Sequence, residues 1–448
     1  MVRDRLAAGL AGVLVLAVAA GASAASFAYV PNELDGTVSV IATATNTIVT
    51  TVTVGILPVG AAATPNGAYV YVTNLGSNAV SVIATATNTV VATVPVGMGP
   101  AGVAVTPDGA HVYVANDSSN TVSVIATATN TVVATVPVGS FPFGVAVTPN
   151  GTFAYVTNEG GGTVSVIALA TNTVVATVPV ASFPFGVAVT PKSAFVYVTS
   201  LGTGTVSVID TATNTVGPTV PVGTSPAGVA VTPNGAAVYV ANRDSNTVSV
   251  IATATNTVGA TVPVGKGPAG VAVMPDGTHV YVGNVVDNTV SVIDTVTNTV
   301  VATVPVGQFP LALGQFIQTI TSVPFAAFSP RVEVAASTGA FEVNSTFTLG
   351  AGSPGIHPLT DTVTLQLGAF TITIPAGSFL QGPGGKFVFE GVINGVTLEA
   401  IIAPLDGGGF AFRAEGAGAS GLPTTSAVTV GLTIGINTAP PVATAEFR

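Results

Sequence analysis

Apolar residues along most of this chain alternate with small polar ones in short runs, and four such runs recur at a fixed interval. Within residues 100–139 the runs are Gly102–Thr106, His111–Ala115, Thr121–Ala126 and Thr131–Val136. A period of two places successive side chains on opposite faces of a sheet, so each run predicts a β-strand. Val, Ile, Thr and Tyr dominate the runs, as expected for strands. No run has the 3.6-residue periodicity of a helix, which argues against a helical solenoid.

A tyrosine marks the same place in every repeat. Successive copies lie 42 residues apart, at Tyr29, Tyr71, Tyr113, Tyr155, Tyr197, Tyr239 and Tyr281. Pro107-Asp108-Gly109 predicts a tight turn between the first two strands, and Thr129-Asn130-Thr131 predicts one between the last two. Four antiparallel strands in 40–45 residues are typical of one β-propeller blade. We expect each tyrosine to pack between neighbouring blades, with its hydroxyl bonded to a backbone group.

The two ends of the repeat region are incomplete blades that complement each other. The N-terminal end begins with a second strand at Phe27–Pro31, whereas the C-terminal end stops after a first strand at Leu311–Phe316. Pairing these two segments would complete one blade from both ends and hide the free sheet edges. The sequence therefore predicts a seven-bladed β-propeller over residues 25–317, with six continuous blades and one composite closing blade.

The repeated phrases carry a family resemblance. Tyr71-Val-Thr-Asn and Tyr155-Val-Thr-Asn follow Thr-Pro-Asn-Gly and precede Ala-Thr-Asn-Thr. This pattern resembles the YVTN-type propeller repeats of surface-layer-like and other secreted proteins of archaea and bacteria, and it is similar to lactonase-type propellers. The resemblance implies the propeller fold, but propellers host many activities. Lactonase-type relatives would imply polar or metal-binding residues at the central opening, whereas the innermost strands here read Gly-Val-Ala-Val-Thr. That difference weighs against a hydrolase.

The N-terminus has the layout of a secretory signal peptide. Arg3 and Arg5 precede an apolar run from Leu6 to Ala20, and Ala22-Ser23-Ala24 offers a cleavage site. We expect residues 1–24 to be removed, leaving no membrane span; an uncleaved anchor is the alternative. The protein would then be secreted, periplasmic or on the cell surface. The remaining chain has 7 basic and 18 acidic residues, a charge balance that argues against nucleic-acid binding.

Comparing the repeats separates two faces of the disc. The turns between strands one and two and between strands three and four are nearly invariant, and we call their side the constant face. The loops between strands two and three, and those between blades, differ from repeat to repeat and define the variable face. We predict a binding surface there, formed by Leu57, Met98, Phe141, Phe143, Phe183, Phe185, Phe309, Asp117, Glu159, Arg243, Asp244, Lys266 and Asp287.

Two interpretations of these residues stay open. The apolar ones could form an arc near the central opening with an acidic rim outside it, and exposed apolar patches commonly bind partners. Alternatively, the rings fill the tops of the blade junctions and the acids are solvated loop charges, spread too widely to share an ion.

The residues that usually carry chemistry are scarce. The chain has no cysteine and three histidines. His111 and His279 occupy a strand position that holds an aromatic residue in other repeats, and His357 has no neighbouring carboxylate. No metal-ligand spacing, nucleophile elbow or phosphate-binding loop is present, so we predict no catalytic residue, metal or cofactor.

Residues 331–448 follow a different pattern. After a connector at residues 318–330, about eight alternating runs predict an antiparallel β-sandwich-like domain, and Asn394-Gly395 predicts a two-residue hairpin turn. We interpret the whole chain as a non-enzymatic binding or structural module. Its partner would be a protein or glycan at the cell envelope, or a second copy of the chain. The alternative is a lactonase-like hydrolase or lyase that uses a divalent cation at the variable face.

Overall fold

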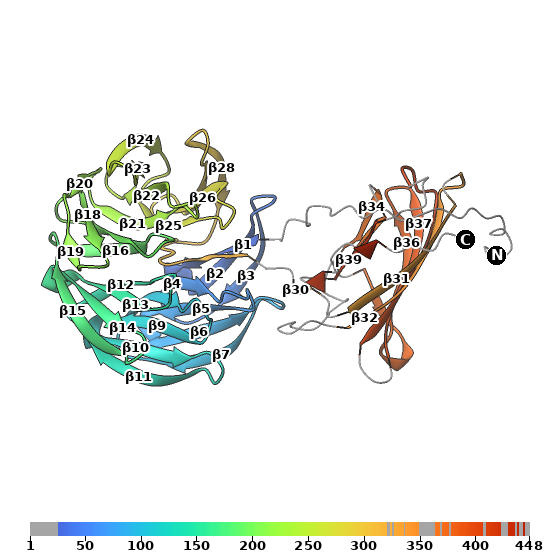
Figure 1. The fold of residues 1–448 in the computed structure, drawn as a ribbon, viewed down its shortest axis with the longest axis horizontal. Coiled ribbons are helices and arrows are strands. Elements are labelled where there is room, and N and C mark those ends of the chain that lie inside the picture. Colours follow the sequence, from blue (N-terminus) through green and yellow to red (C-terminus); the bar gives the residue numbers. More distant parts are fainter. Residues whose placement is uncertain are drawn as a thin grey trace. The chain divides into compact units, whose positions relative to one another are not determined.

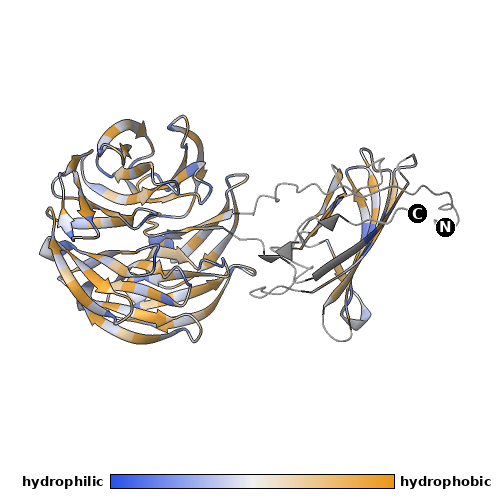
Figure 2. Ribbon diagram, viewed as in Figure 1, coloured by the Kyte–Doolittle hydropathy of each residue, from blue (hydrophilic) through white to orange (hydrophobic). Residues whose placement is uncertain are grey.

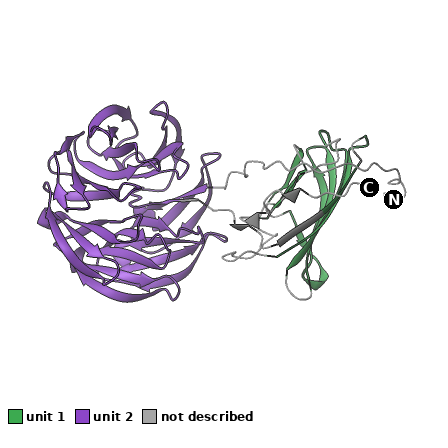
Figure 3. Ribbon diagram, viewed as in Figure 1, with its two compact units in different colours: residues 1–24, 321–448 green, residues 25–320 purple. Residues whose placement is uncertain are grey.

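The chain forms two compact units, residues 25–320 and a unit that contains residues 321–448 (Figure 3). The computed structural model describes residues 26–319, 323–324, 327–335, 337–348, 363–367, 370–375, 378–405, 409–422, 429–434, 437–438 and 442–443. The expected signal peptide lies outside the described residues. Among the residues that are described, no helix is long and apolar enough to cross a membrane.

Residues 25–320 form a seven-bladed propeller, as predicted, and its strands follow one another around the ring in Figure 1. The first, innermost strands of the continuous blades are β4 (Pro58–Ala63), β8 (Pro100–Val105), β12 (Pro142–Val147), β16 (Pro184–Val189), β21 (Pro226–Val231) and β25 (Pro268–Val273). The second strands are β1 (Ser26–Asn32), β5 (Tyr69–Asn74), β9 (His111–Asn116), β13 (Phe153–Asn158), β17 (Phe195–Ser200), β22 (Ala237–Asn242) and β26 (His279–Asn284).

The outer half of each blade is equally regular. The third strands are β2 (Thr37–Ala42), β6 (Ala79–Ala84), β10 (Thr121–Ala126), β14 (Thr163–Ala168), β18 (Thr205–Asp210), β23 (Thr247–Ala252) and β27 (Thr289–Asp294). The fourth strands are β3 (Thr47–Thr53), β7 (Thr89–Pro95), β11 (Thr131–Pro137), β15 (Thr173–Pro179), β24 (Thr257–Pro263) and β28 (Thr299–Pro305), with β19 (Thr215–Val216) and β20 (Val220–Pro221) in one blade. Figure 2 shows how much of these strands is hydrophobic. We number the composite blade 1 and continue along the chain, so that β4 begins blade 2 and β25 begins blade 7.

The repeated tyrosines join the blades. Each is almost fully buried, and its hydroxyl donates to an asparagine side chain in the last turn of the next blade, as Tyr155 does to Oδ1 of Asn214 at 3.1 Å. Tyr281 donates to Oδ1 of Asn46 at 2.6 Å and so completes the circle. The expected backbone partner was therefore wrong for six of the seven hydroxyls; only Tyr281 also reaches a carbonyl, that of Thr43 at 3.4 Å. The hydroxyl bonds to the turn asparagine and not to a backbone carbonyl, because the left-handed backbone of that asparagine directs its amide toward the neighbouring blade.

The closing blade forms from the two ends of the propeller segment, as predicted, but its inner strand differs from the predicted one. Strand β29 (Ile317–Thr319), rather than Leu311–Phe316, pairs with β1. In the other blades a glycine near the start of the first strand touches the next blade, and a methyl group on Gly144 would lie 2.4 Å from the carbonyl oxygen of Phe185. Ala312 occupies that position here and has φ 47°. The chain therefore bulges toward the axis, where Leu313 exchanges hydrogen bonds with β4 before β29 begins.

The unit that contains residues 321–448 has two sheets around one core. One sheet has the order β31 (Ala327–Ala335), β32 (Ala340–Thr348), β38 (Phe410–Ala417), β37 (Val396–Pro404), β36 (Phe387–Ile393) and β35 (Leu380–Gln381). The other has the order β30 (Val323–Pro324), β40 (Asn437–Thr438), β39 (Thr429–Ile434), β33 (Val363–Leu367) and β34 (Phe370–Ile374), with β41 (Val442–Ala443) beside β39. Their apolar side chains share one cluster, so the sandwich-like prediction is confirmed. The pairing is antiparallel except between β30 and β40.

Two local details qualify the predictions for this unit. Asn394 and Gly395 have positive φ values of 50° and 82° and form the expected hairpin turn between β36 and β37. Strands extend into residues 318–330, which the sequence suggested as a connector. Pro330 does not interrupt β31, because β31 is an edge strand and one side of it needs no ladder hydrogen bond.

Candidate functional site

Two sets of loops meet on the variable face and are tied together in every blade. The loops after the second strands include short 3-10 turns η1 (Glu33–Asp35), η2 (Leu75–Ser77), η3 (Asp117–Ser119) and η4 (Glu159–Gly161). The first residue after the second strand donates its N–H to the residue before the inner-strand proline, as Glu159 does to the Phe141 carbonyl at 2.9 Å. This bond recurs in all seven blades, so the backbone of the face is constant although its side chains vary.

The residue before each proline has left-handed backbone geometry. Phe141, Phe183 and Phe309 have φ values of 51°, 55° and 58°, and the four equivalents are Leu57, Gly99, Ser225 and Gly267. A non-glycine residue in this region costs about 1–2 kcal/mol. Phe141 is held there from both sides, because its N–H donates to Oδ1 of Asn120 at 2.9 Å and its carbonyl accepts from Glu159. Large side chains are thus presented in a conformation that glycine would adopt more easily.

In three blades a large strained residue, Leu57, Phe141 or Phe183, is paired with a glycine as the second residue of the facing loop, whereas in blade 1 Phe309 is paired with Leu34. A methyl group on Gly160 would lie 2.5 Å from Cδ2 of Phe141, and one on Gly202 would lie 2.8 Å from Cδ2 of Phe183. Where the strained residue is glycine the relation reverses, since a methyl group on Gly267 would lie 2.8 Å from Val286. The rings therefore rest on glycine backbone, yet Phe141 and Phe183 remain 54% and 53% exposed.

The predicted apolar arc is divided between two locations. Phe143 and Phe185 stack with ring centroids 4.2 Å apart. They belong to an apolar group that we call the axial cluster, composed of Val59, Ala101, Phe185, Ala227, Ala269, Val285, Leu311 and Leu313 with Leu75, Phe143, Leu201 and Phe309 packed against it. The residue that follows the inner-strand proline in every blade is a member, so the seven blades converge on it. Met98, Phe141 and Phe183 stay outside it and are at least half exposed, and Leu57 is partly exposed.

Two of the acids, Asp117 and Glu159, occupy a different place from the outer rim that the sequence suggested. Asp117 and Glu159 occupy the position that holds Leu75, Leu201 and Val285 in other blades, and those three residues pack on the axial cluster. By this equivalence the two carboxylates lie at the inner ring. Both side chains are half-buried.

Burial changes the ionisation of these inner carboxyls. It raises the pKa of Glu159 above its usual range, and the charge of Asp117 raises it further. Burial likewise raises the pKa of Asp117, against a hydrogen bond from Ser118 that lowers it. The pKa of Glu33 is raised by burial, while the charge of Arg243 lowers it. The charge of Asp117 thus acts on the ionisation of Glu159.

The remaining predicted residues lie together on another part of the face. Arg243, Asp244 and Lys266 line one groove that also includes Leu201 and Val286. Asp244 accepts a hydrogen bond from the Ser225 hydroxyl at 2.6 Å. Asp287 lies in the next loop, where its carboxylate accepts the backbone N–H of Lys266 at 2.8 Å.

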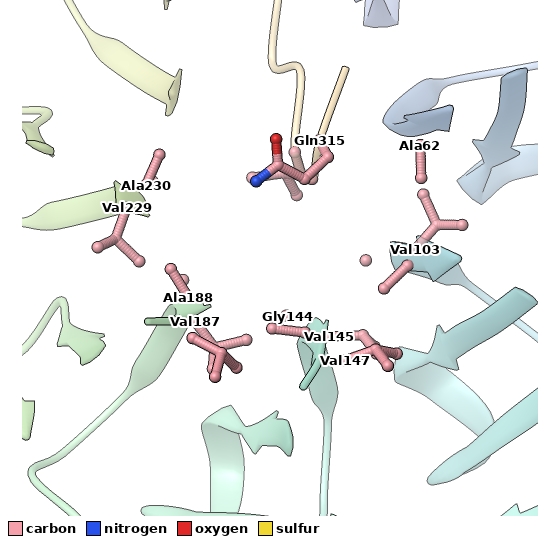
Figure 4. A pocket seen from close by; sticks show the side chains of 18 of the residues that line it. Ala62, Val103, Gly144, Val145, Val147, Val187, Ala188, Val229, Ala230 and Gln315 are labelled. Atoms are coloured by element: carbon pink, nitrogen blue, oxygen red, sulfur yellow. The ribbon is translucent and has the colours of Figure 1, made fainter. Parts of the chain in front are cut away.

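The central opening contains a cavity of about 270 Å³, lined mainly by Val, Ala and Gly of the inner strands (Figure 4). Phe143, Phe185 and Leu313 belong both to this lining and to the axial cluster, so the cluster borders the cavity. Gln315 contributes the amide seen in the opening in Figure 4. The sequence analysis missed Gln315 because it treated residues 311–316 as an ordinary inner strand. Within the described residues, no three His, Cys, Asp or Glu side chains are placed to hold a metal ion.

Residues 20–142 and 127–303 match the family model described as lactonase, seven-bladed β-propeller. The chain belongs to this lactonase-type propeller family. The match covers most of the repeat region and ends at residue 303, before the C-terminal unit. No curated protein matches the chain.

Solved structures agree with the family fold. Hydrazine synthase of Kuenenia stuttgartiensis has 22% identity and a TM-score of 0.52, with 66% of this chain and 96% of that chain covered. A functionally unknown protein from Desulfotomaculum acetoxidans DSM 771 has 21% identity and a TM-score of 0.58, covering 65% and 98%. A candidate 6-phosphogluconolactonase from Bacteroides uniformis ATCC 8492 has 17% identity and a TM-score of 0.57, covering 66% and 99%. At these identities the likeness concerns the fold alone.

Proposed function

We propose that this protein is a secreted or cell-surface propeller that binds a protein or glycan of the cell envelope through its variable face, without catalysing a reaction. The observation that carries the proposal is the pair Phe141 and Phe183. Each is held half-exposed in left-handed geometry against a glycine. Backbone strain of this kind concentrates at functional sites. Exposed aromatic side chains are also the groups that contribute most at binding surfaces.

A matched pair of double variants tests this proposal. Phe141→Ser with Phe183→Ser imitates Ser225, which occupies the same backbone position in blade 6 with φ 53°. Val133→Ser with Val175→Ser removes equally exposed apolar groups, 54% and 55%, from the outer strands. Binding of the full chain would be measured to isolated envelope polysaccharide and to isolated envelope proteins, each separated from the other.

The expected result is a loss of at least about tenfold in affinity for one fraction in the phenylalanine variant only, which corresponds to about 1.4 kcal/mol. Unfolding free energies should stay within about 0.5 kcal/mol of wild type in both variants. Equal binding by the two double variants would contradict the proposal. A large loss of stability in the phenylalanine variant would show that those rings serve packing instead.

Family membership favours one alternative, a lactonase-like hydrolase or lyase that uses a divalent cation at the variable face. The interacting pair of Asp117 and Glu159 would be the place for such an ion. Melting temperatures with calcium, with magnesium and with EDTA distinguish the two functions, because a specific ion stabilises the folded state by mass action. A rise that Asp117→Asn abolishes would support the alternative; identical curves would favour the binding module.

A further inference from the structure

Basic residues are rare in the propeller and two of them share one groove. Residues 26–319 contain Lys192, Arg243 and Lys266 as their lysines and arginines, against ten acids. Arg243 of blade 6 and Lys266 of blade 7 line a groove of about 590 Å³ on the variable face. Both side chains are exposed. Two cations brought together on an acidic domain indicate a place where negative charge is bound.

Two carboxylates beside the groove hold the loops. Asp244 accepts the Ser225 hydroxyl, and Asp287 accepts the Lys266 backbone N–H. Oδ1 of Asn246 accepts the N–H of Gly267 at 2.9 Å, which directs the amide oxygen to the loop and leaves the NH2 group as a donor. Neither Arg243 nor Lys266 forms an ion pair within 4 Å with another described residue, and the charge of Arg243 acts on Glu33 from a greater distance.

The groove is therefore rich in donors and apolar at its sides. An arginine offers five N–H groups in a planar fork that suits a carboxylate, and lysine adds a compact charge. Leu201 and Val286 supply apolar surface next to them, with Val286 62% exposed. We propose that this groove binds a ligand that carries a carboxylate beside an apolar group. The inference rests on the proposed binding function of the variable face and gives that face a second, chemically defined contact.

The other blades show that folding does not require these cations. The positions of Arg243 and Lys266 hold Asp117 and Ser140 at the junction of blades 3 and 4, and Glu159 and Ser182 at the next junction. The backbone hydrogen bonds are the same at all three junctions, as the bond from Arg243 N–H to the Ser225 carbonyl at 3.0 Å illustrates. The cations thus distinguish one junction from its equivalents without contributing to the repeated scaffold.

Titration calorimetry of the full chain tests the site at low ionic strength. The probes are N-acetyl-L-leucine, its neutral amide N-acetyl-L-leucinamide, and D-glucuronate. Arg243→Gln with Lys266→Gln removes both charges, and Lys192→Gln removes the third cation, which lies in a turn of the constant face. We expect N-acetyl-L-leucine to bind more tightly than its amide. The double variant should weaken that binding about tenfold or more, while Lys192→Gln leaves it unchanged.

The probes also separate the sources of the carboxylate. Preference for N-acetyl-L-leucine supports a ligand such as a peptide terminus, with an apolar group beside the carboxylate. Preference for glucuronate would overturn the inference, because that sugar has no apolar group beside its carboxylate. Equal binding of acid and amide, full retention of binding in the double variant, or an equal loss with Lys192→Gln would each overturn the inference. Such a failure leaves the comparison of the phenylalanine and valine variants intact, because that experiment uses other residues and another ligand.

Discussion

On the constant face of the propeller the same side chains repeat from blade to blade, whereas on the variable face the same backbone carries different side chains. On the constant face each buried, repeated tyrosine donates its hydroxyl to an asparagine in a turn of the next blade, and the series closes at Tyr281 and Asn46. On the variable face the bond that recurs in every blade is a main-chain one, from N–H to carbonyl, and the side-chain bonds beside it differ from blade to blade, as those to Asn120 and Asp287 do. Backbone bonds do not depend on residue type, so this face can change its chemistry while the ring stays intact.

We expect the largest loss of stability from substitutions of the repeated tyrosines, whose side chains join the blades. Tyr155→Ala should lower the unfolding free energy by about 3–5 kcal/mol, because it leaves a cavity between two blades. Tyr155→Phe should cost only about 1 kcal/mol, since it removes the hydrogen bond to Asn214 and keeps the ring. Burial raises the pKa of Tyr155 to about 12, so the hydroxyl remains a donor across neutral pH. Urea unfolding measures both values, and equal losses would mean that the hydroxyl, not the ring, dominates.

A smaller effect is expected where the variable face does depend on side-chain size. Gly160→Ala should lower stability by about 1–3 kcal/mol, because the new methyl group meets the Phe141 ring. Combining it with Phe141→Ser should restore most of the loss, as blades without a large residue at this position accept a side chain opposite. A double-mutant cycle from chemical unfolding gives the coupling free energy. Strictly additive losses would refute the size complementarity.

The smallest effect concerns the inner carboxyls. The pKa of Glu159 is raised in the folded protein, so the folded state binds this proton more tightly than the unfolded state does. The favourable contribution is therefore present at low pH and is lost as pH rises through the raised pKa. Glu159→Gln should stabilise the protein by less than about 1 kcal/mol at pH 7, with the difference vanishing in acid. Melting curves from pH 3 to pH 8 measure this, and a gain that is constant with pH would argue against it.

The C-terminal unit also places like charges next to one another, on neighbouring strands of one sheet. Glu333, Glu342, Glu415, Glu399 and Glu390 stand directly opposite one another across five neighbouring strands. Arg413 forms ion pairs with Glu342 and Glu415 in this row. Like charges placed opposite one another weaken a sheet. The strands nevertheless form, because their other faces bury the shared apolar core.

Much of the architecture was available from the sequence because it rests on local periodicity. Alternation, turn residues and the 42-residue interval predicted the blades, and the unmatched ends at Phe27–Pro31 and after Pro310 predicted ring closure. The inner strand of the closing blade was misplaced by a few residues. Ala312 stands where other blades have glycine, and the cost of its extra methyl group depends on a contact with another blade.

The candidate site was only partly predictable. Repeat comparison found the residues of the variable face, including Phe141, Arg243 and Lys266. It did not find Gln315 in the central cavity, nor did it place Asp117 and Glu159 inward of the exposed rings.

The sequence by itself determined that this chain builds seven similar blades, a closed ring and a separate β-domain, since strand period and turn chemistry act between residues close along the chain. The tertiary structure alone decided which loop residues meet. Whether a side chain joins the axial cluster, rests on a glycine or remains beside a cation depends on neighbours 20 or more residues away, as for Phe141 and Asn120 or Lys266 and Asp287. Those contacts arise from how the blades converge on one axis, and that convergence has no signature within a single repeat.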